Sequence, residues 1–312
     1  MGTRYNISVV AEANINVDAV QEAVDLRLEE INRQMSTYDP ESELSRFNAD
    51  SQVDAWFAVS PDTARVAAAA IDYAERTSCA FDPTVSPAVD LWGFGPVGRR
   101  RTPPDDAEVT AVRQRIGYDR VAVRREPAAL RKSSAEAALD LSAIAKGFAV
   151  DELSELLADR GIDRSMVEIG GEVVTRGVKP DGSSWRIGIE RPTSGGREIG
   201  MIVELAGALA SSGDYRNFFE AENVRYSHTI DPRTARPVTH QLATVTVCTP
   251  TCLEADALAT ALMVMGPEKG YDWCLEHQIA ALFQMYEDGT IQERATPEFE
   301  QLIVRQVKPV AR

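Results

Sequence analysis

Apolar residues recur with helical spacing in four segments of the chain. In residues 16–34, the apolar positions that share one face of a helix are Val20, Val24, Leu28 and Ile31. Asn16 precedes them and is a favoured N-cap residue. Similar patterns, each with a cap or a glycine stop at one end, predict three further helices, at residues 60–76, 143–160 and 253–265.

Short runs rich in β-branched or alternating apolar residues predict strands around these helices. They cover residues 1–10, 166–169, 185–190, 199–205, 242–248 and 279–285. Helices and strands mix without the regular alternation of a doubly wound sheet, so the pattern favours an α+β fold with mixed sheets and packed helices. No repeat, low-complexity tract or long linker divides the chain, and we expect a single domain over residues 1–312.

Residues 81–102 follow neither pattern. Prolines and glycines punctuate this segment, so we expect neither a regular helix nor a central strand. Its Trp92 and Phe94 either line a ligand site or fill the core.

Residues 169–172 and 210–216 are expected to be glycine-containing turns. The first would let backbone pass close to a ligand or a strand, and the second would offer hydroxyl and N–H groups.

Charge and cysteine content narrow the function classes. Of the 312 residues, 33 are Lys or Arg and 48 are Asp or Glu, which gives a formal net charge of −15. Such a surface repels a phosphate backbone, so nucleic acid is not expected as a partner. No apolar run approaches the roughly 18 residues of a membrane-spanning helix. The four cysteines lack a paired framework and zinc-ligand spacing, which predicts core positions.

Residues 139–147 place polar groups at the start of a predicted helix. Asp140 and Ser142 precede the helix, and Lys146 lies in its first turn. The free N–H groups of a helix N-terminus and an added lysine form a credible phosphate site. The alternative is an ordinary helix cap with a solvated lysine.

Two further polar groupings could carry chemistry. Asp256 and Thr260 are four residues apart and share one helix face, which suits Mg²⁺, although a capping Asp and a Thr bonded to its own helix would give the same pattern. His228 is the one histidine of three that lies in a polar motif. It is the best candidate for a general base, or else a structural histidine.

Nine short blocks occur in a defined order along the chain: residues 1–3, 35–48, 80–87, 91–96, 140–147, 167–172, 211–216, 227–232 and 254–260. As an ordered set they resemble the ApbE family of FAD:protein FMN transferases. The resemblance covers nearly the whole chain and implies an ApbE-like fold with two closely associated lobes. The chain departs from the family at Ser86 and Ala235, where glycine is usual.

The resemblance implies an enzyme that binds FAD and Mg²⁺, moves FMN onto a Thr or Ser hydroxyl of a target protein through a phosphoester bond, and releases AMP. By resemblance, the residues that line FAD are Met1, Tyr38, Ala80, Phe81, Asp82, Asp140, Lys146 and Ile230. The metal would be held by the carbonyl of Ala143 together with Asp256 and Thr260. Lys146 would help to neutralise the diphosphate, and His228 would take the proton from the target hydroxyl.

The same resemblance implies where the protein works. Family members are usually exported and often lipid-anchored, so we expect a periplasmic or cell-envelope protein in mature or trimmed form. Its acceptor would be a subunit of a membrane electron-transfer complex, and membrane contact is expected only through a lipid anchor absent from this chain. Two alternatives stay open: a metal-dependent FAD pyrophosphatase that gives FMN and AMP, and a non-catalytic flavin-binding protein. Retention of Asp256, Thr260 and His228 argues against the second.

Overall fold

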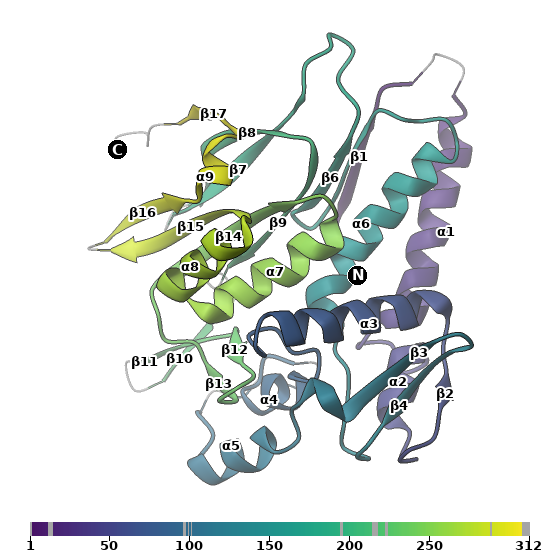
Figure 1. Cartoon of the computed structure of the whole chain (residues 1–312), viewed down its shortest axis with the longest axis vertical. Coiled ribbons are helices and arrows are strands. Elements are labelled where there is room, and N and C mark those ends of the chain that lie inside the picture. The colour runs from purple at the N-terminus through teal and green to yellow at the C-terminus, as the bar shows by residue number, and fades with distance from the viewer. Residues whose placement is uncertain are drawn as a thin grey trace. The chain divides into compact units, whose positions relative to one another are not determined.

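The computed structural model in Figure 1 describes residues 2–11, 15–95, 98, 100, 102–193, 196–213, 218–221, 224–287 and 289–307. The chain forms two compact units. Unit 1 contains residues 26–145 and 216–239, and unit 2 contains residues 2–25, 146–215 and 240–312. Two helices continue from one unit into the other, α1 (Val17–Met35) and α6 (Ser142–Ala158). The expectation of a single domain stays a prediction.

Unit 2 contains an antiparallel sheet of seven strands in the order β1-β5-β6-β9-β14-β15-β16. The strands are β1 (Tyr5–Val9), β5 (Ser165–Ile169), β6 (Glu172–Arg176), β9 (Gly207–Gly213), β14 (Leu242–Thr249), β15 (Ala280–Glu287) and β16 (Thr290–Ala295). A second sheet has the order β17-β8-β7, with β17 (Ile303–Gln306), β8 (Gly196–Leu205) and β7 (Trp185–Thr193).

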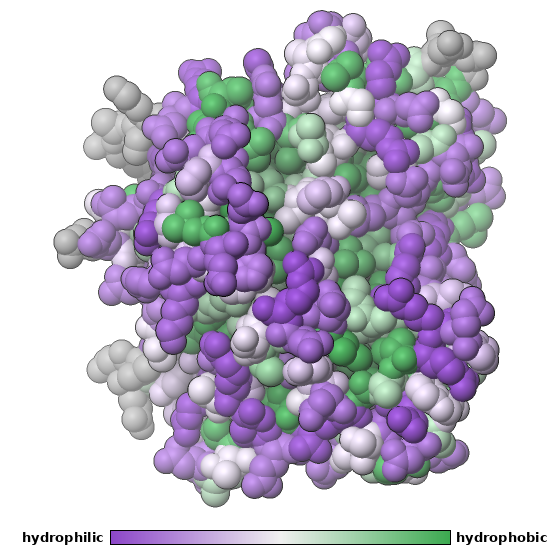
Figure 2. All heavy atoms as spheres, viewed as in Figure 1, coloured by the Kyte–Doolittle hydropathy of each residue, from purple (hydrophilic) through white to green (hydrophobic). Residues whose placement is uncertain are grey.

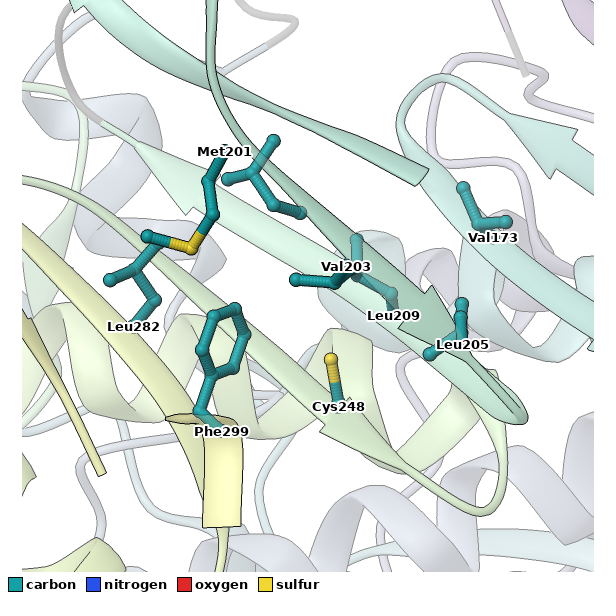
Figure 3. Close-up of a cluster of buried hydrophobic side chains, with 9 residues drawn as sticks. Val173, Met201, Val203, Leu205, Leu209, Cys248, Leu282 and Phe299 are labelled. Carbon is teal, nitrogen blue, oxygen red and sulfur yellow. The ribbon is translucent and has the colours of Figure 1, made fainter. Parts of the chain in front are cut away.

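Both sheets of unit 2 contribute to one hydrophobic core. Figure 3 shows buried side chains from β6, β8, β9, β14 and β15, which form one cluster together with Phe299 of the short helix α9 (Pro297–Glu300). Phe299 and Val203 are fully buried. Replacing a buried phenylalanine with alanine lowers the free energy of unfolding by about 3–5 kcal/mol. Burial of Phe299 therefore makes a large contribution to the stability of the unit.

Helix α7 (Cys252–Met265) lies against β9 and β14 and is buried on nearly every side. The side chain of Thr251 caps its first turn, and the helix ends at Gly266, where φ is +83°. Helix α8 (Pro267–His277) follows at once. Because α7 is apolar almost throughout, its buried Asp256 is an exception that needs a partner.

In its described residues, unit 1 is mainly helical, with one small sheet and two short hairpins. Its helices are α2 (Glu43–Ala49), α3 (Pro61–Arg76), α4 (Ser86–Leu91), α5 (Asp106–Arg113) and the 3₁₀ helix η1 (Tyr118–Arg120). The sheet has the order β2-β4-β3, with β2 (Phe57–Ala58), β4 (Ala128–Lys132) and β3 (Val121–Arg125). The hairpins join β10 (Phe218–Ala221) to β11 (Val224–Ser227) and β12 (Ile230–Asp231) to β13 (Arg236–Pro237).

The predicted α+β class is confirmed, and so are the four predicted helices, as α1, α3, α6 and α7. The predicted caps also form: Asn16 accepts the N–H of Ala19 at 3.1 Å, and Ser60 accepts the N–H of Thr63. Strands occupy all six predicted segments. Cys248, Cys252 and Cys274 are buried as predicted, whereas Cys79 is partly exposed.

Two expectations about irregular segments are wrong. Residues 81–102 contain the helix α4, because Pro87 lies in its first turn, where the missing N–H is not needed. Residues 210–213 form the end of strand β9 rather than a turn, because they pair with β14. The remainder of that predicted turn, residues 214–216, lies outside the described residues.

Ala235 adopts a left-handed φ of +55° and is fully buried. Glycine reaches this conformation without strain, which explains why the family usually has glycine at the position. Alanine keeps the turn at a modest cost in strain, so this departure leaves the local backbone intact.

Hydrophilic residues predominate on the face seen in Figure 2, and hydrophobic ones occur in separate patches. Large apolar side chains that are exposed lie in different parts of the chain, for example Leu26 in α1, Trp56 just before β2 and Ile199 in β8. Among the described residues, no helix is both long enough and apolar enough to cross a membrane.

Candidate active site

A charged cluster lies in unit 2 where α6, β6 and α7 meet. The Nζ atom of Lys146 is 2.8 Å from Oε1 of Glu172 and 3.3 Å from Oδ1 of Asp256. The two acidic side chains are only 5% and 6% exposed, whereas the lysine side chain is 31% exposed. The cluster therefore sets two buried carboxylates against one ammonium group that water can still reach.

Close packing of α6 against α7 brings the lysine and the aspartate together. A Cβ atom on Gly147 would lie 2.2 Å from the carbonyl oxygen of Cys252, so only glycine permits this approach. The N–H of Gly147 donates to Oδ2 of Asp256 at 2.9 Å. Asp151, one turn further along α6, accepts the N–H groups of Cys252 and Leu253 at 2.8 and 2.9 Å. Lys146 thus supplies positive charge to the cluster, whereas the adjacent Gly147 permits the close packing of α6 against α7.

A two-residue hairpin places Glu172 in the cluster. Ile169 pairs with Glu172 across β5 and β6, and the intervening Gly170 and Gly171 have φ values of +67° and +110°. Two consecutive positive φ values are the signature of a tight hairpin and favour glycine at both positions. The predicted turn at residues 169–172 is confirmed, and it makes Glu172 the first residue of β6.

Burial and unequal charge shift the pKa values of the cluster. Desolvation raises the pKa of Glu172 to about 7, although the nearby Lys146 ammonium opposes the shift. Burial acts to lower the pKa of Lys146, but Asp256 and Glu172 outweigh it and raise that pKa above its ordinary value. Within the described part of the chain, Oε2 of Glu172 is buried without a hydrogen-bond partner. The lysine therefore stays charged, and with both carboxylates ionised the cluster has an excess of negative charge.

The oxygen donors of the cluster fit a hard divalent cation. Asp256 and Thr260 are one turn apart on α7, and carboxylate and hydroxyl oxygens suit Mg²⁺. A cation would also offset the excess negative charge. Ala143, whose carbonyl the resemblance assigns to the metal, lies in the first turn of α6. No group of three His, Cys, Asp or Glu side chains in the described residues could hold a metal, so a cation here needs hydroxyl, carbonyl, water or substrate oxygens as well.

Asp82, which the resemblance assigns to FAD, is a buried carboxylate in unit 1. Its Oδ1 accepts the N–H and the hydroxyl of Thr84 at 2.8 and 2.6 Å, and its Oδ2 accepts the N–H of Tyr118 at 3.1 Å. Burial raises the pKa of Asp82, and the bonds from Thr84 oppose that shift. Both oxygens are therefore engaged in holding the loop together.

Asp140 lies beside this loop. Its N–H donates to the carbonyl of Pro83 at 2.7 Å, so the predicted FAD segments at residues 80–82 and 140 are neighbours within unit 1. The Asp140 carboxylate accepts the N–H of Ser142 at 2.9 Å and also bonds to the Ser142 hydroxyl. The Asp140 carboxylate thus accepts the N–H of the first residue of α6, and Lys146 is paired rather than merely solvated.

The other predicted FAD residues differ widely in exposure. Tyr38 is 76% exposed, whereas Ala80, Phe81 and Ile230 are at most 5% exposed. Ile230 packs in the hydrophobic cluster around Trp92. The buried three could therefore offer a ligand mainly backbone groups, and Tyr38 alone offers an open ring. Met1 lies outside the described residues. The assignment of these residues to FAD stays a prediction.

His228 lies in unit 1 between β11 and β12. The Phe94 ring contacts it edge-on, with centroids 6.3 Å apart and planes inclined by 70°. Trp92 is 2% exposed and donates from Nε1 to the carbonyl of Ala235 at 2.8 Å, so it fills the core. Phe94 is partly buried, packs against the same hydrophobic cluster as Trp92 and also lies beside the candidate base.

Lys146 and Asp256 were found in the sequence as separate motifs, and the structure brings them together. The sequence analysis includes Gly147 only in a sequence block, and Glu172 only in a block and in the predicted turn at residues 169–172. One signal could have singled out Glu172: an acidic residue directly after a glycine pair, at the start of the apolar strand residues 173–174. The contact between Gly147 and α7 leaves no such signal.

Comparisons with known proteins identify the family of this chain. A model of the ApbE family matches residues 1–283. The FAD:protein FMN transferase of Vibrio cholerae is 44% identical over 302 residues, which cover 96% of this chain and 90% of the relative. The solved structure of the flavin transferase ApbE from Vibrio cholerae has a TM-score of 0.87 at 41% identity, covering 97% of this chain and 96% of that one. The apo flavinyl transferase ApbE of Pseudomonas stutzeri gives 0.88 at 37% identity, covering 97% and 94%. The chain therefore belongs to the ApbE family, and its curated relatives are enzymes.

Proposed function

We propose that this protein is an FAD:protein FMN transferase that moves FMN from FAD onto a Thr or Ser hydroxyl of a target protein, with Mg²⁺ as the metal and AMP as the leaving group. One observation carries the proposal. The cluster of Lys146, Glu172 and Asp256 combines a charged lysine, suited to a diphosphate, with buried carboxylates, suited to a cation. The names of the relatives support the reaction class.

The reaction exchanges one phosphoester partner for another. The acceptor hydroxyl oxygen attacks the phosphorus of the FMN half, and the bond from that phosphorus to the bridging oxygen breaks. The electron pair of that bond leaves with AMP. The hydroxyl proton goes to His228, whose neutral imidazole can accept it.

The chain's own residues favour this step electrostatically. Lys146 stays protonated because its pKa is raised, so it can donate hydrogen bonds to phosphate oxygens throughout the reaction. Asp256, fixed by the N–H of Gly147, keeps its carboxylate oriented on α7. When bound, a divalent cation would offset the charge of the diphosphate and of the leaving AMP.

The target and the location belong to the proposal as well. We propose that the protein works in the cell envelope or periplasm, and that its acceptor is a subunit of a membrane electron-transfer complex. The family resemblance supports these points. We also propose that residues 1–312 work as one flavin transferase domain, a view supported by the family match over residues 1–283.

The test is a labelling reaction. The protein is incubated with FAD, Mg²⁺ and a protein that the Vibrio cholerae relative flavinylates, and that relative serves as the positive control. We expect covalent flavin fluorescence on the acceptor in a denaturing gel, with AMP released in equal amount, and neither product in the presence of EDTA. Free FMN and AMP without labelled acceptor would instead identify an FAD pyrophosphatase. Intact FAD would identify a flavin-binding protein.

A further inference from the structure

Glu172 is the residue of the cluster to which the family resemblance assigns no role. It is buried, it lies nearer to Lys146 than Asp256 does, and among the described residues its Oε2 atom has no hydrogen-bond partner. Burying a carboxylate is unfavourable unless its interactions compensate for lost hydration. Its position therefore calls for a specific explanation.

The explanation begins with a conflict at Asp256. Its Oδ2 atom accepts the N–H of Gly147, and its Oδ1 atom is 3.3 Å from the Lys146 ammonium. A cation that binds through Oδ1 must compete with that ammonium, because two positive charges at contact distance repel each other. Lys146 then needs a second anionic partner to stay at the site, and Glu172 is that partner.

We propose that Glu172 is a positioning residue for Lys146: it holds the ammonium at the site when a cation occupies Asp256, so that cation and lysine bind the diphosphate together. The inference rests on the proposed function, since it concerns the same site. Glu172 acts through the lysine and does not itself contact the cation.

A second ion pair between the same two elements provides a matched control. Glu155 on α6 and Arg176 on β6 lie 2.7 Å apart, but their side chains are 64% and 35% exposed. Exposed pairs of this kind typically contribute less than about 1 kcal/mol. If the link between α6 and β6 mattered only for packing, loss of either pair would have similar effects.

The experiment is a double-mutant cycle read as FAD binding, by quenching of flavin fluorescence, at a series of Mg²⁺ concentrations. The variants are Glu172→Gln, Lys146→Met and the two combined, with Glu155→Gln as control. In the protein that retains Lys146, Glu172→Gln should raise the Mg²⁺ concentration needed for half-maximal FAD binding by roughly 10- to 100-fold. In the Lys146→Met background, the same change should shift it by less than about threefold, because residues that act through one another are not additive.

Equal shifts in both backgrounds would overturn the inference, since Glu172 would then act on the cation directly. A similar loss in Glu155→Gln would also overturn it. FAD binding by the wild type that ignores Mg²⁺ would contradict the proposed function itself. Urea denaturation of each variant shows whether it is folded, and Glu172→Asp, which keeps the charge but withdraws it from Lys146, gives a second measurement with an expected intermediate shift.

Discussion

Asp82 in unit 1 and Glu172 in unit 2 are both buried carboxylates with raised pKa values, yet their surroundings differ in kind. Asp82 accepts three hydrogen bonds, from Thr84 and Tyr118, and both of its oxygens are engaged. Glu172 shares one lysine with Asp256, and its second oxygen has no partner among the described residues. Burial of an acid therefore does not by itself mark a binding site.

The distinguishing feature is the local charge balance. Backbone N–H and hydroxyl donors satisfy Asp82 within its own loop, which is what a structural carboxylate requires. In the cluster of unit 2, two carboxylates surround one ammonium group, and when both are ionised they leave negative charge for a cation to offset. We therefore expect substitution of Asp82 to affect mainly the stability of its loop, and substitution in the cluster of unit 2 to affect mainly ligand binding.

The largest effect is expected from Asp256→Asn. Loss of the charge should reduce Mg²⁺-dependent turnover to the level seen without the metal, a loss of roughly four orders of magnitude if the cation supplies about 5–6 kcal/mol. Because the single amide oxygen cannot accept from both Lys146 and the N–H of Gly147, a stability loss of about 1–3 kcal/mol is expected as well. Steady-state assays across Mg²⁺ concentrations measure the first effect and urea denaturation the second. Wild-type activity at limiting Mg²⁺ would reject the metal assignment.

The next largest effect is expected from His228→Asn. Removing a general base should slow covalent flavin transfer by roughly two to four orders of magnitude while FAD affinity changes little. Wild-type transfer should also fall at acid pH, because only neutral imidazole accepts a proton. His277, which is exposed on α8 beside Trp273, provides the control His277→Asn with no expected effect. Unchanged labelling by His228→Asn would leave His228 a structural residue.

The sequence indicated both Asp256 and His228 as candidates, together with much of the fold. Periodicity and caps located α1, α3, α6 and α7 because local signals fix such helices. Polar residues in a motif marked His228 and Asp256. The link from Lys146 to Glu172 was not predictable, because it joins residues 26 apart through a hairpin register and the packing at Gly147. Long-range packing of this kind has no local signature.

Asp82→Asn tests the structural side of the comparison. The amide can still accept from Thr84, but its NH₂ group would face the N–H of Tyr118, so one buried donor loses its acceptor. The free energy of unfolding should fall by about 1–3 kcal/mol. Denaturation in urea measures this loss, and Glu41→Gln on the exposed surface is the control. No loss of stability would show that the Asp82 loop does not depend on its carboxylate.

Whereas Asp82→Asn should lower the free energy of unfolding, Glu172→Gln should raise it relative to the wild type as pH increases. The pKa of Glu172 is raised from 4.5 to about 7, so its favourable contribution is complete below about pH 4.5 and is lost as pH rises through about 7. The neutral glutamine does not titrate. The free energy of unfolding of the variant, relative to that of the wild type, should therefore increase by about 2 kcal/mol from pH 5 to pH 8. Urea denaturation at both pH values measures the difference. A difference that is the same at both would contradict the raised pKa.

The most direct test of the account asks whether the buried, negatively charged cluster couples a cation to FAD. FAD dissociation constants are measured by flavin fluorescence with and without Mg²⁺, in the wild type and in Asp256→Asn. We predict that Mg²⁺ tightens FAD binding at least about tenfold in the wild type and less than about twofold in the variant. The same Mg²⁺ effect in both proteins would contradict the account, because the cation would then bind without the cluster.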